Sequence, residues 1–307
     1  MRLRLPAAGL MLTLSAVLAA GCGSSPTSPT TAPTSDLGQV SSTLSASSTL
    51  VDDQLAEDST QVSAAAALVS NGAQPAALIR PFTWWQHVTQ ETRTWDFAWS
   101  DTDTSGHPQT CIATLSKHMT GGFVIVPVSP TDSTQGDTMR IVKPLDKTLT
   151  RKVMLKRILI NGARLWKVVD VTGASVTTPG ATTHILSVRL QSKSGVDTTI
   201  TDPLQWLSLR HIVKFGTSDS VTVTVTTNHT NDVVYIHRWD WRHRLHNNLD
   251  GTYSFSWVTS PWSGWRHFAI QAMSHGTLYD DVAPVSLEAW HEPFRVVGGQ
   301  PDVDYYP

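Results

Sequence analysis

The chain has few of the features that identify common classes of protein. Its 307 residues include only two cysteines, so no cysteine pair is expected to bridge the sheets of a folded body. The 23 basic and 25 acidic residues leave a net charge of -2, which argues against a dedicated nucleic-acid binder. Only four of the acids are glutamates, while Thr, Ser and Val run through most of the chain. Because helix formers are scarce and strand formers abundant, the composition predicts an all-β body.

Enzyme signatures are also absent. There is no Gly-x-Ser-x-Gly elbow, no His-Glu-x-x-His motif, no P-loop and no dinucleotide-binding glycine motif. His237, His243 and His246 lie close together, but their spacing is too generic to select a metal. We therefore expect no metal and no cofactor, and we assign no catalytic residue. Carboxylates from distant parts of the chain could still make it a divergent hydrolase.

The longest apolar run lies at the N-terminus. Arg2 and Arg4 precede an apolar stretch from Ala7 to Ala20, which suits a secretory signal and is too short to span a membrane as a helix. The following residues, Leu18-Ala19-Ala20-Gly21-Cys22, resemble the lipobox of bacterial lipoproteins. This resemblance implies that residues 1–21 are a cleaved lipoprotein signal peptide.

The same resemblance implies that Cys22 is the lipid attachment site and carries acyl chains such as palmitate. Those chains would hold the mature protein on a membrane, because each buried methylene contributes about 0.8 kcal/mol. Gly23 is not the aspartate that retains such proteins at the inner membrane, so the family's sorting rule points to the outer membrane. Cys111 then has no partner and is expected to be a small buried side chain.

Composition divides the next part of the chain in two. Residues 22–36 are rich in Ser, Thr and Pro and read as the lipid anchor and a tether. Over residues 37–72, apolar residues recur with a period of about 3.6, which predicts one amphipathic helix. Its serine-rich part has low helix propensity, so we expect it to lie on a sheet or to fray.

Residues 80–215 read as successive strands with short connections. Trp95, Phe97 and Trp99 alternate with polar or small residues, which places three aromatic rings on one face of a strand. Short connections favour antiparallel neighbours, so this region is predicted to be an antiparallel meander sheet or an open barrel. Turns are expected at four places: Asp103–Gly106, Thr120–Gly122, Asn161–Gly162 and Pro179–Gly180.

In residues 216–299, apolar and polar residues alternate more regularly than in residues 80–215. Residues 300–307 are expected to form a C-terminal tail. Val221, Val223 and Val225 share one strand face, as do Tyr253, Phe255 and Trp257 on a later strand. The stretches Asp250–Trp257 and Gly264–Ile270 resemble the strand edges of bacterial immunoglobulin-like modules. The resemblance implies an immunoglobulin-like β-sandwich that serves as a spacer, adhesive unit or docking platform.

Two polar runs are candidates for binding. The run from Arg238 to Arg244 interleaves aromatic and basic residues; if extended, it points Trp239 and Trp241 to one face and Arg238, Arg242 and Arg244 to the other. We take Trp239, Trp241, Arg242 and Arg244 as candidate ligand-binding residues, with packing of the tryptophans as the alternative. The basic residues between Lys143 and Arg157 are expected to lie on a solvated sheet face.

These observations predict a lipoprotein of the bacterial cell envelope, on the periplasmic or surface-exposed side of the outer membrane. Its partners would be the membrane, through the acyl chains, and an envelope protein or glycan, with no nucleic acid. The expected role is binding or architecture. A glycan-binding protein that uses exposed tryptophans is the first alternative, and a divergent extracytoplasmic hydrolase is the second.

Overall fold

The computed structural model describes residues 34–51, 54–57, 59–63, 79, 81–127, 140–238 and 241–298, so the predicted signal peptide, tether and C-terminal tail lie almost entirely outside the described residues. The body is all-β, as the composition predicts, and its strand pairs are antiparallel except that β9 runs parallel to β16. In chain order the described elements are α1 (Thr34–Ala46), the 3-10 helix η1 (Gln54–Ala56), β1 (Val62–Ser63), β2 (Pro81–Thr102), β3 (Pro108–Pro127), β4 (Ile141–Ile160), β5 (Ala163–Thr177), β6 (Ile185–Ser192), β7 (Asp197–Ile200), β8 (Leu207–Ser208), β9 (Lys214–Gly216), β10 (Ser220–Thr227), β11 (Val233–Arg238), β12 (Trp241–Arg244), β13 (His246–Asn247), β14 (Thr252–Val258), β15 (Gly264–Met273), α2 (His275–Tyr279) and β16 (Leu287–Val297).

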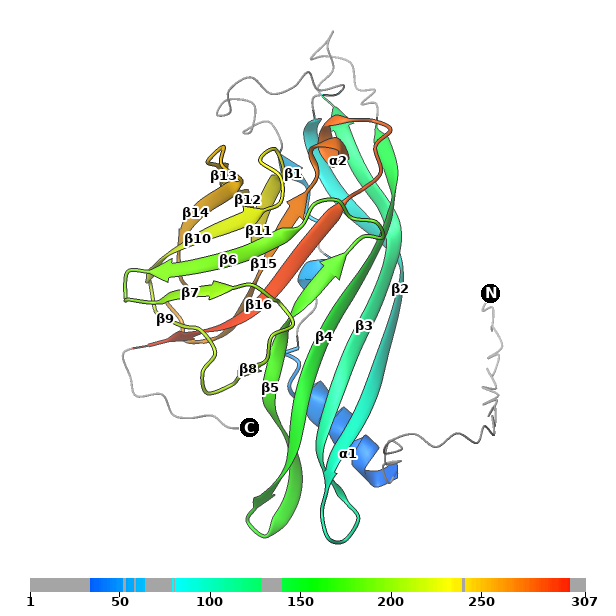
Figure 1. The fold of residues 1–307 in the computed structure, drawn as a ribbon, viewed down its shortest axis with the longest axis vertical. Helices are drawn as coiled ribbons and strands as arrows, with labels where there is room; N and C mark the ends of the chain where they lie inside the picture. Colours follow the sequence, from blue (N-terminus) through cyan, green and yellow to red (C-terminus); the bar gives the residue numbers. More distant parts are fainter. Residues whose placement is uncertain are drawn as a thin grey trace, which may run out of the picture.

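The strands form two sheets (Figure 1). The large sheet has the order β1-β2-β3-β4-β5-β16-β15-β11-β12, with β8 paired to β5 and β9 paired to β16. The small sheet has the order β13-β14-β10-β6-β7. The two long hairpins, β2–β3 and β4–β5, extend beyond the small sheet at the bottom of the view.

One core lies between the small sheet and strands β11, β15 and β16 of the large sheet. Val221, Val223 and Val225 are fully buried there, and Tyr253 and Trp257 join them from β14. The predicted inward faces of these strands are therefore confirmed, although Phe255 is only partly buried.

Sheet pairing does not follow the predicted boundary between residues 215 and 216. β6 precedes that boundary and pairs with β10, which follows it. β5 likewise pairs with β16. Strands from both predicted domains thus share each sheet, so residues 216–299 alone would lack neighbours in both.

The large sheet curls, and a second core fills its inside. β11, β15 and β16 are buried on both faces, because one face packs against the small sheet and the other against β2, β3 and β4. The curl brings opposite ends of the sheet together: Trp84 on β2 stacks on Phe123 and donates a hydrogen bond to the Tyr235 hydroxyl on β11, 3.2 Å away.

The N-terminal helix is shorter than predicted, because α1 ends at Ala46 rather than near residue 72. The Ser and Thr residues that follow compete for backbone hydrogen bonds, and the chain continues as a turn. The remaining helix does cover a sheet face: Val40 and Leu44 pack on a third core at the hairpins, with Cys111, Val153 and others. Trp166 of β5 donates to Asp36 in the first turn of α1, 3.1 Å away.

Three of the four predicted turns are present. Asp103–Gly106, Asn161–Gly162 and Pro179–Gly180 are turns, and the glycine of each has a positive φ. The turn predicted at Thr120–Gly122 is wrong, because β3 runs straight through it. Gly121 is instead required by close packing: a Cβ there would overlap the carbonyl oxygen of His87, where β2 has an irregular register.

Cys111 is fully buried, as expected for a small core side chain, and burial raises the pKa of its thiol to about 12. In the described part of the chain, no helix is long and apolar enough to cross a membrane.

Candidate functional site

The segment after α1, residues 47–57, runs along the opening of the curled sheet, and we call it the strap; Asp52 and Asp53 lie outside the described residues. Two buried lysines hold it. Lys117 on β3 forms an ion pair with Glu57 of the strap, and its Nζ lies 3.3 Å from Oε1 of Glu91. Lys147 on β4 donates to the carbonyl of Ala56 and to the side chain of Gln86. Because a buried ammonium without acceptors is costly, these contacts fix where the strap lies.

The prediction of a solvated basic face is wrong for Lys143, Lys147 and Arg151, which are buried, whereas Lys156 is exposed and Lys152 and Arg157 are partly exposed. Lys143, Lys147 and Arg151 alternate with exposed or partly exposed residues and point into the protein, on the same strand face as Leu145 and Leu149. Lys143 donates to carbonyls around α2, and burial lowers its pKa to about 8. The inward face of β4 thus carries cations that hold other segments in place.

The three histidines of the candidate metal group are not brought together. His237 points into the curled sheet, His243 stacks on Phe255 toward the small sheet, and His246 is exposed on β13. Burial, together with Arg242 and other nearby cations, holds the pKa of His237 well below its usual value. Among the described residues, no group of three potential metal ligands is present.

The aromatic and basic run of residues 238–244 is a hairpin and not one extended strand. Arg238 pairs with Trp241 across β11 and β12, so these two side chains share a face, and Arg238 lies over the Trp241 ring at 5.2 Å. Trp239 lies outside the described residues. The side chains of Arg242 and Arg244 lie on the opposite face of β12 from Trp241.

Both of these arginines point into the curled sheet. Arg242 donates to His237 and lies over the Trp84 ring at 5.0 Å. Arg244 donates to the Tyr279 hydroxyl, 3.1 Å away. The structure therefore does not unite Trp241, Arg242 and Arg244 into one binding surface.

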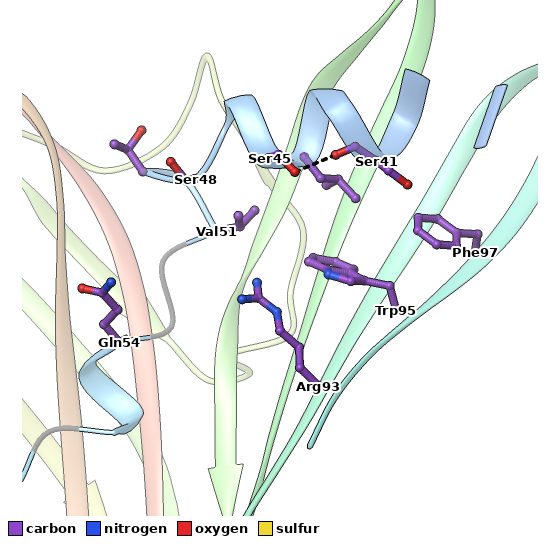
Figure 2. Close-up of a pocket in the computed structure, with 10 residues that line it drawn as sticks. Ser41, Ser45, Ser48, Val51, Gln54, Arg93, Trp95 and Phe97 are labelled. Carbon is purple, nitrogen blue, oxygen red and sulfur yellow. Dashed lines mark hydrogen bonds between the residues drawn. The ribbon is translucent and has the colours of Figure 1, made fainter. Parts of the chain in front are cut away.

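A different group of side chains forms an open groove between α1, the strap and β2, with a volume of about 550 Å³. We call it the aromatic groove. Figure 2 shows Trp95 and Phe97 of β2 on one wall and Ser41 and Ser45 of α1 across from them. The lining is completed by Leu44, Ser48, Thr49, Val51, Gln54 and Arg93.

The two walls of the aromatic groove differ in chemistry. Arg93 lies over the Trp95 ring at 5.7 Å, and both Trp95 and Phe97 are only partly buried. The opposite wall carries hydroxyl groups, at Ser41 and Ser45 one turn apart on α1 and at Ser48 in the strap. Ser45 donates to the carbonyl of Ser41, which leaves its oxygen lone pairs as acceptors.

The sequence carries a signal for this site in the alternation Arg93, Trp95, Phe97, Trp99. We interpreted these rings only as one face of a strand. Trp99 does fit a packing role, because it meets Trp166 edge to face at 5.5 Å. Trp95 and Phe97 lie where the serine-rich helix covers the strand incompletely.

Comparison with known proteins adds no family or relative. No family model, no curated protein and no solved structure matches this chain.

Proposed function

We propose that this protein is a lipid-anchored binding protein of the bacterial cell envelope that takes a carbohydrate in the aromatic groove. The observation that carries the proposal is the pairing of two partly exposed aromatic rings, Trp95 and Phe97, with a facing row of serine hydroxyls. A sugar ring offers the complementary surfaces, since its C–H face packs on aromatic rings and its hydroxyls bond to polar groups.

The size and charge of the groove support this choice. Its volume of about 550 Å³ lies within the range of about 300–1,000 Å³ that is typical of small-ligand sites. The polar groups of its described lining are mostly uncharged hydroxyls and one amide, with Arg93 as the one charged side chain among the described lining residues. Such a lining suits a neutral or weakly acidic glycan better than a polyanion.

Titration calorimetry with a panel of cell-envelope oligosaccharides tests the proposal. We expect Trp95→Ala to weaken binding of a glycan hit by about tenfold or more, because loss of a central aromatic contact costs about 2 kcal/mol or more. Arg93→Gln changes an exposed residue of the same wall and should weaken binding without loss of folding.

Trp262→Ala is the matched control, because Trp262 is 74% exposed and does not line the groove. Equal loss of binding in Trp262→Ala and Trp95→Ala would contradict the proposal, as would a panel with no ligand at all. Unchanged thermal unfolding of Arg93→Gln would separate loss of binding from loss of structure.

The envelope location is a separate part of the proposal and rests on the lipobox-like residues before Cys22. We expect Cys22→Ser to move the protein from the membrane fraction to the soluble extracytoplasmic fraction, since the acyl chains are the anchor. Membrane retention of that variant would count against lipid anchoring and would leave the groove's role intact. The immunoglobulin-like character of residues 216–299 stays a prediction.

A further inference from the structure

A second pocket, of about 650 Å³, lies on the other side of the strap. Thr49 lines both this pocket and the aromatic groove, so the strap is the wall between them. We call it the arginine pocket. Its lining comes from the strap, from β11 and β12, and from the β14–β15 connection with the start of β15: Thr49, Leu55, Arg238, Trp241, Val258, Thr259, Ser260, Pro261, Trp265, Arg266 and His267.

The described lining of the arginine pocket carries positive charge. Two arginines line it, and its described lining contains no carboxylate. Arg266 donates one hydrogen bond, from Nη1 to the carbonyl of Trp265 at 2.7 Å, and its guanidinium packs against Gly264, where a Cβ would come within 3.2 Å of Nη1. The remaining N–H groups of that guanidinium form a fork of the kind that binds carboxylate or phosphate oxygens.

The lining also includes two indole rings and a hydroxyl donor, with Arg238 over Trp241 and Arg295 over Trp265. Trp241 and Trp265 are both partly buried and both belong to its lining. The Ser260 hydroxyl accepts a hydrogen bond from the Trp262 N–H at 3.1 Å and keeps its own proton to donate. His267 is uncharged at neutral pH, because burial lowers its pKa to about 3, so the positive charge comes from the arginines.

We infer that the arginine pocket is a second binding site, specific for a sugar that carries a negatively charged group. The indole rings take the ring of the sugar, and Arg266 with Arg238 takes its carboxylate or phosphate. The arginine pocket shares only Thr49 with the described lining of the aromatic groove, and the inference does not depend on what the groove binds.

Titration calorimetry on the purified full chain with the Trp95→Ala substitution tests the inference, since that background removes an aromatic wall of the groove. The probes are glucuronic acid, glucose 6-phosphate, glucose and inorganic phosphate. We expect the two acidic sugars to bind, and glucose to bind at least about tenfold more weakly, because a hydrogen bond to a charged group contributes about 1.5–3 kcal/mol. Inorganic phosphate should also bind more weakly than glucose 6-phosphate, since it has no ring to stack.

Arg266→Gln should weaken binding of the acidic sugars by about tenfold or more. Arg140→Gln is the control, because it removes the same charge from an exposed arginine that lines neither pocket. The inference is overturned if glucose or inorganic phosphate binds as tightly as the acidic sugar that binds best. It is also overturned if Arg140→Gln weakens binding as much as Arg266→Gln, or if neither acidic sugar binds at about 1 mM. Binding confined to glucuronic acid identifies a carboxylate site, and binding confined to glucose 6-phosphate a phosphate site; either result supports the inference.

Discussion

The carboxyl group of Glu292 offers a quantitative test of how the strands of the large sheet pack. Its side chain lies on the face of β16 that is turned toward the small sheet and is only 2% exposed. It fits there because residue 173 on β5 is a glycine: a Cβ at Gly173 would lie 2.6 and 2.7 Å from the two carboxylate oxygens. Burial raises the pKa of Glu292 to about 8, although nearby Arg151 opposes the change. The carboxyl group is therefore protonated in the folded protein at neutral pH.

We predict that Glu292→Gln stabilises the protein increasingly as pH rises. The native state holds the proton up to about pH 8, whereas the unfolded chain releases it near the ordinary value of 4.5. The stability due to the protonated group is thus complete below about pH 4.5 and lost as pH rises to about 8. At about 1.36 kcal/mol per pH unit, this loss amounts to about 4 to 5 kcal/mol. Glutamine keeps the neutral shape at every pH and avoids the loss.

Urea titrations of both proteins at about pH 5, 6.5 and 8 measure this difference. The free energies of unfolding should be similar near pH 5 and should differ by several kcal/mol, in favour of the variant, near pH 8. The buried histidines, such as His267 and His291, are present in both proteins and cancel in the comparison. A difference that does not depend on pH, or a variant that is less stable at pH 8, would refute the reasoning and indicate an ionised Glu292 paired with Arg151.

Two further predictions compare matched substitutions in the same urea assay. Gly121→Ala should cost about 1–3 kcal/mol or more, because its methyl group would overlap the His87 carbonyl, whereas Gly38→Ala should stabilise by about 0.5–1 kcal/mol, because nothing lies within 4 Å of that helical site. A destabilised Gly38→Ala would mean that α1 does not run through residue 38. Trp257→Ala should cost about 3–5 kcal/mol, since the ring is buried between the sheets, and Ser256→Ala no more than about 0.5 kcal/mol, since that residue is exposed. Equal effects at residues 256 and 257 would mean that the strand register is shifted by one residue.

The sequence predicted those parts of the fold that depend on local signals. The alternation of Val221, Val223 and Val225 requires a strand with one buried face, and it is buried as expected. Asn161–Gly162 is a turn because both residues have positive φ values, of 50° and 82°, which this residue pair adopts readily. Such features need only neighbours along the chain.

Pairing between distant strands could not be predicted in the same way. The partnership of β5 with β16 joins residues more than a hundred positions apart, and no alternation pattern names a partner. The predicted boundary at residue 216 marks the point where the alternation of apolar and polar residues becomes more regular. Both sheets contain strands from each side of that boundary. Likewise, the apolar residues between positions 37 and 72 have the spacing of a helix, but α1 ends at Ala46, where a run of serine and threonine residues begins.

The burial of three basic side chains on β4 could have been predicted from the sequence. Lys143, Lys147 and Arg151 occupy every fourth position on β4, and Leu145 and Leu149 lie between them on the same strand face. Period-2 alternation alone therefore places these cations on the apolar face. Charge alone does not predict solvent exposure. A lysine on the apolar face of a strand indicates that another segment of the protein supplies hydrogen-bond acceptors to it.

That requirement links the core to the two pockets. Lys117 and Lys147 find their acceptors in Glu57, Ala56 and Gln86, so the strap lies across the opening of the curled sheet where these lysines place it. The strap carries Leu50, Val51 and Leu55 among polar residues, and the aromatic groove and the arginine pocket lie on its two sides. The rings that line them are partly exposed beside the strap, which is held by these charged contacts and by the buried side chains of Leu50, Val51 and Ala56. Both pockets then follow from the pattern of β4 and from the low helix propensity of the residues after Ala46.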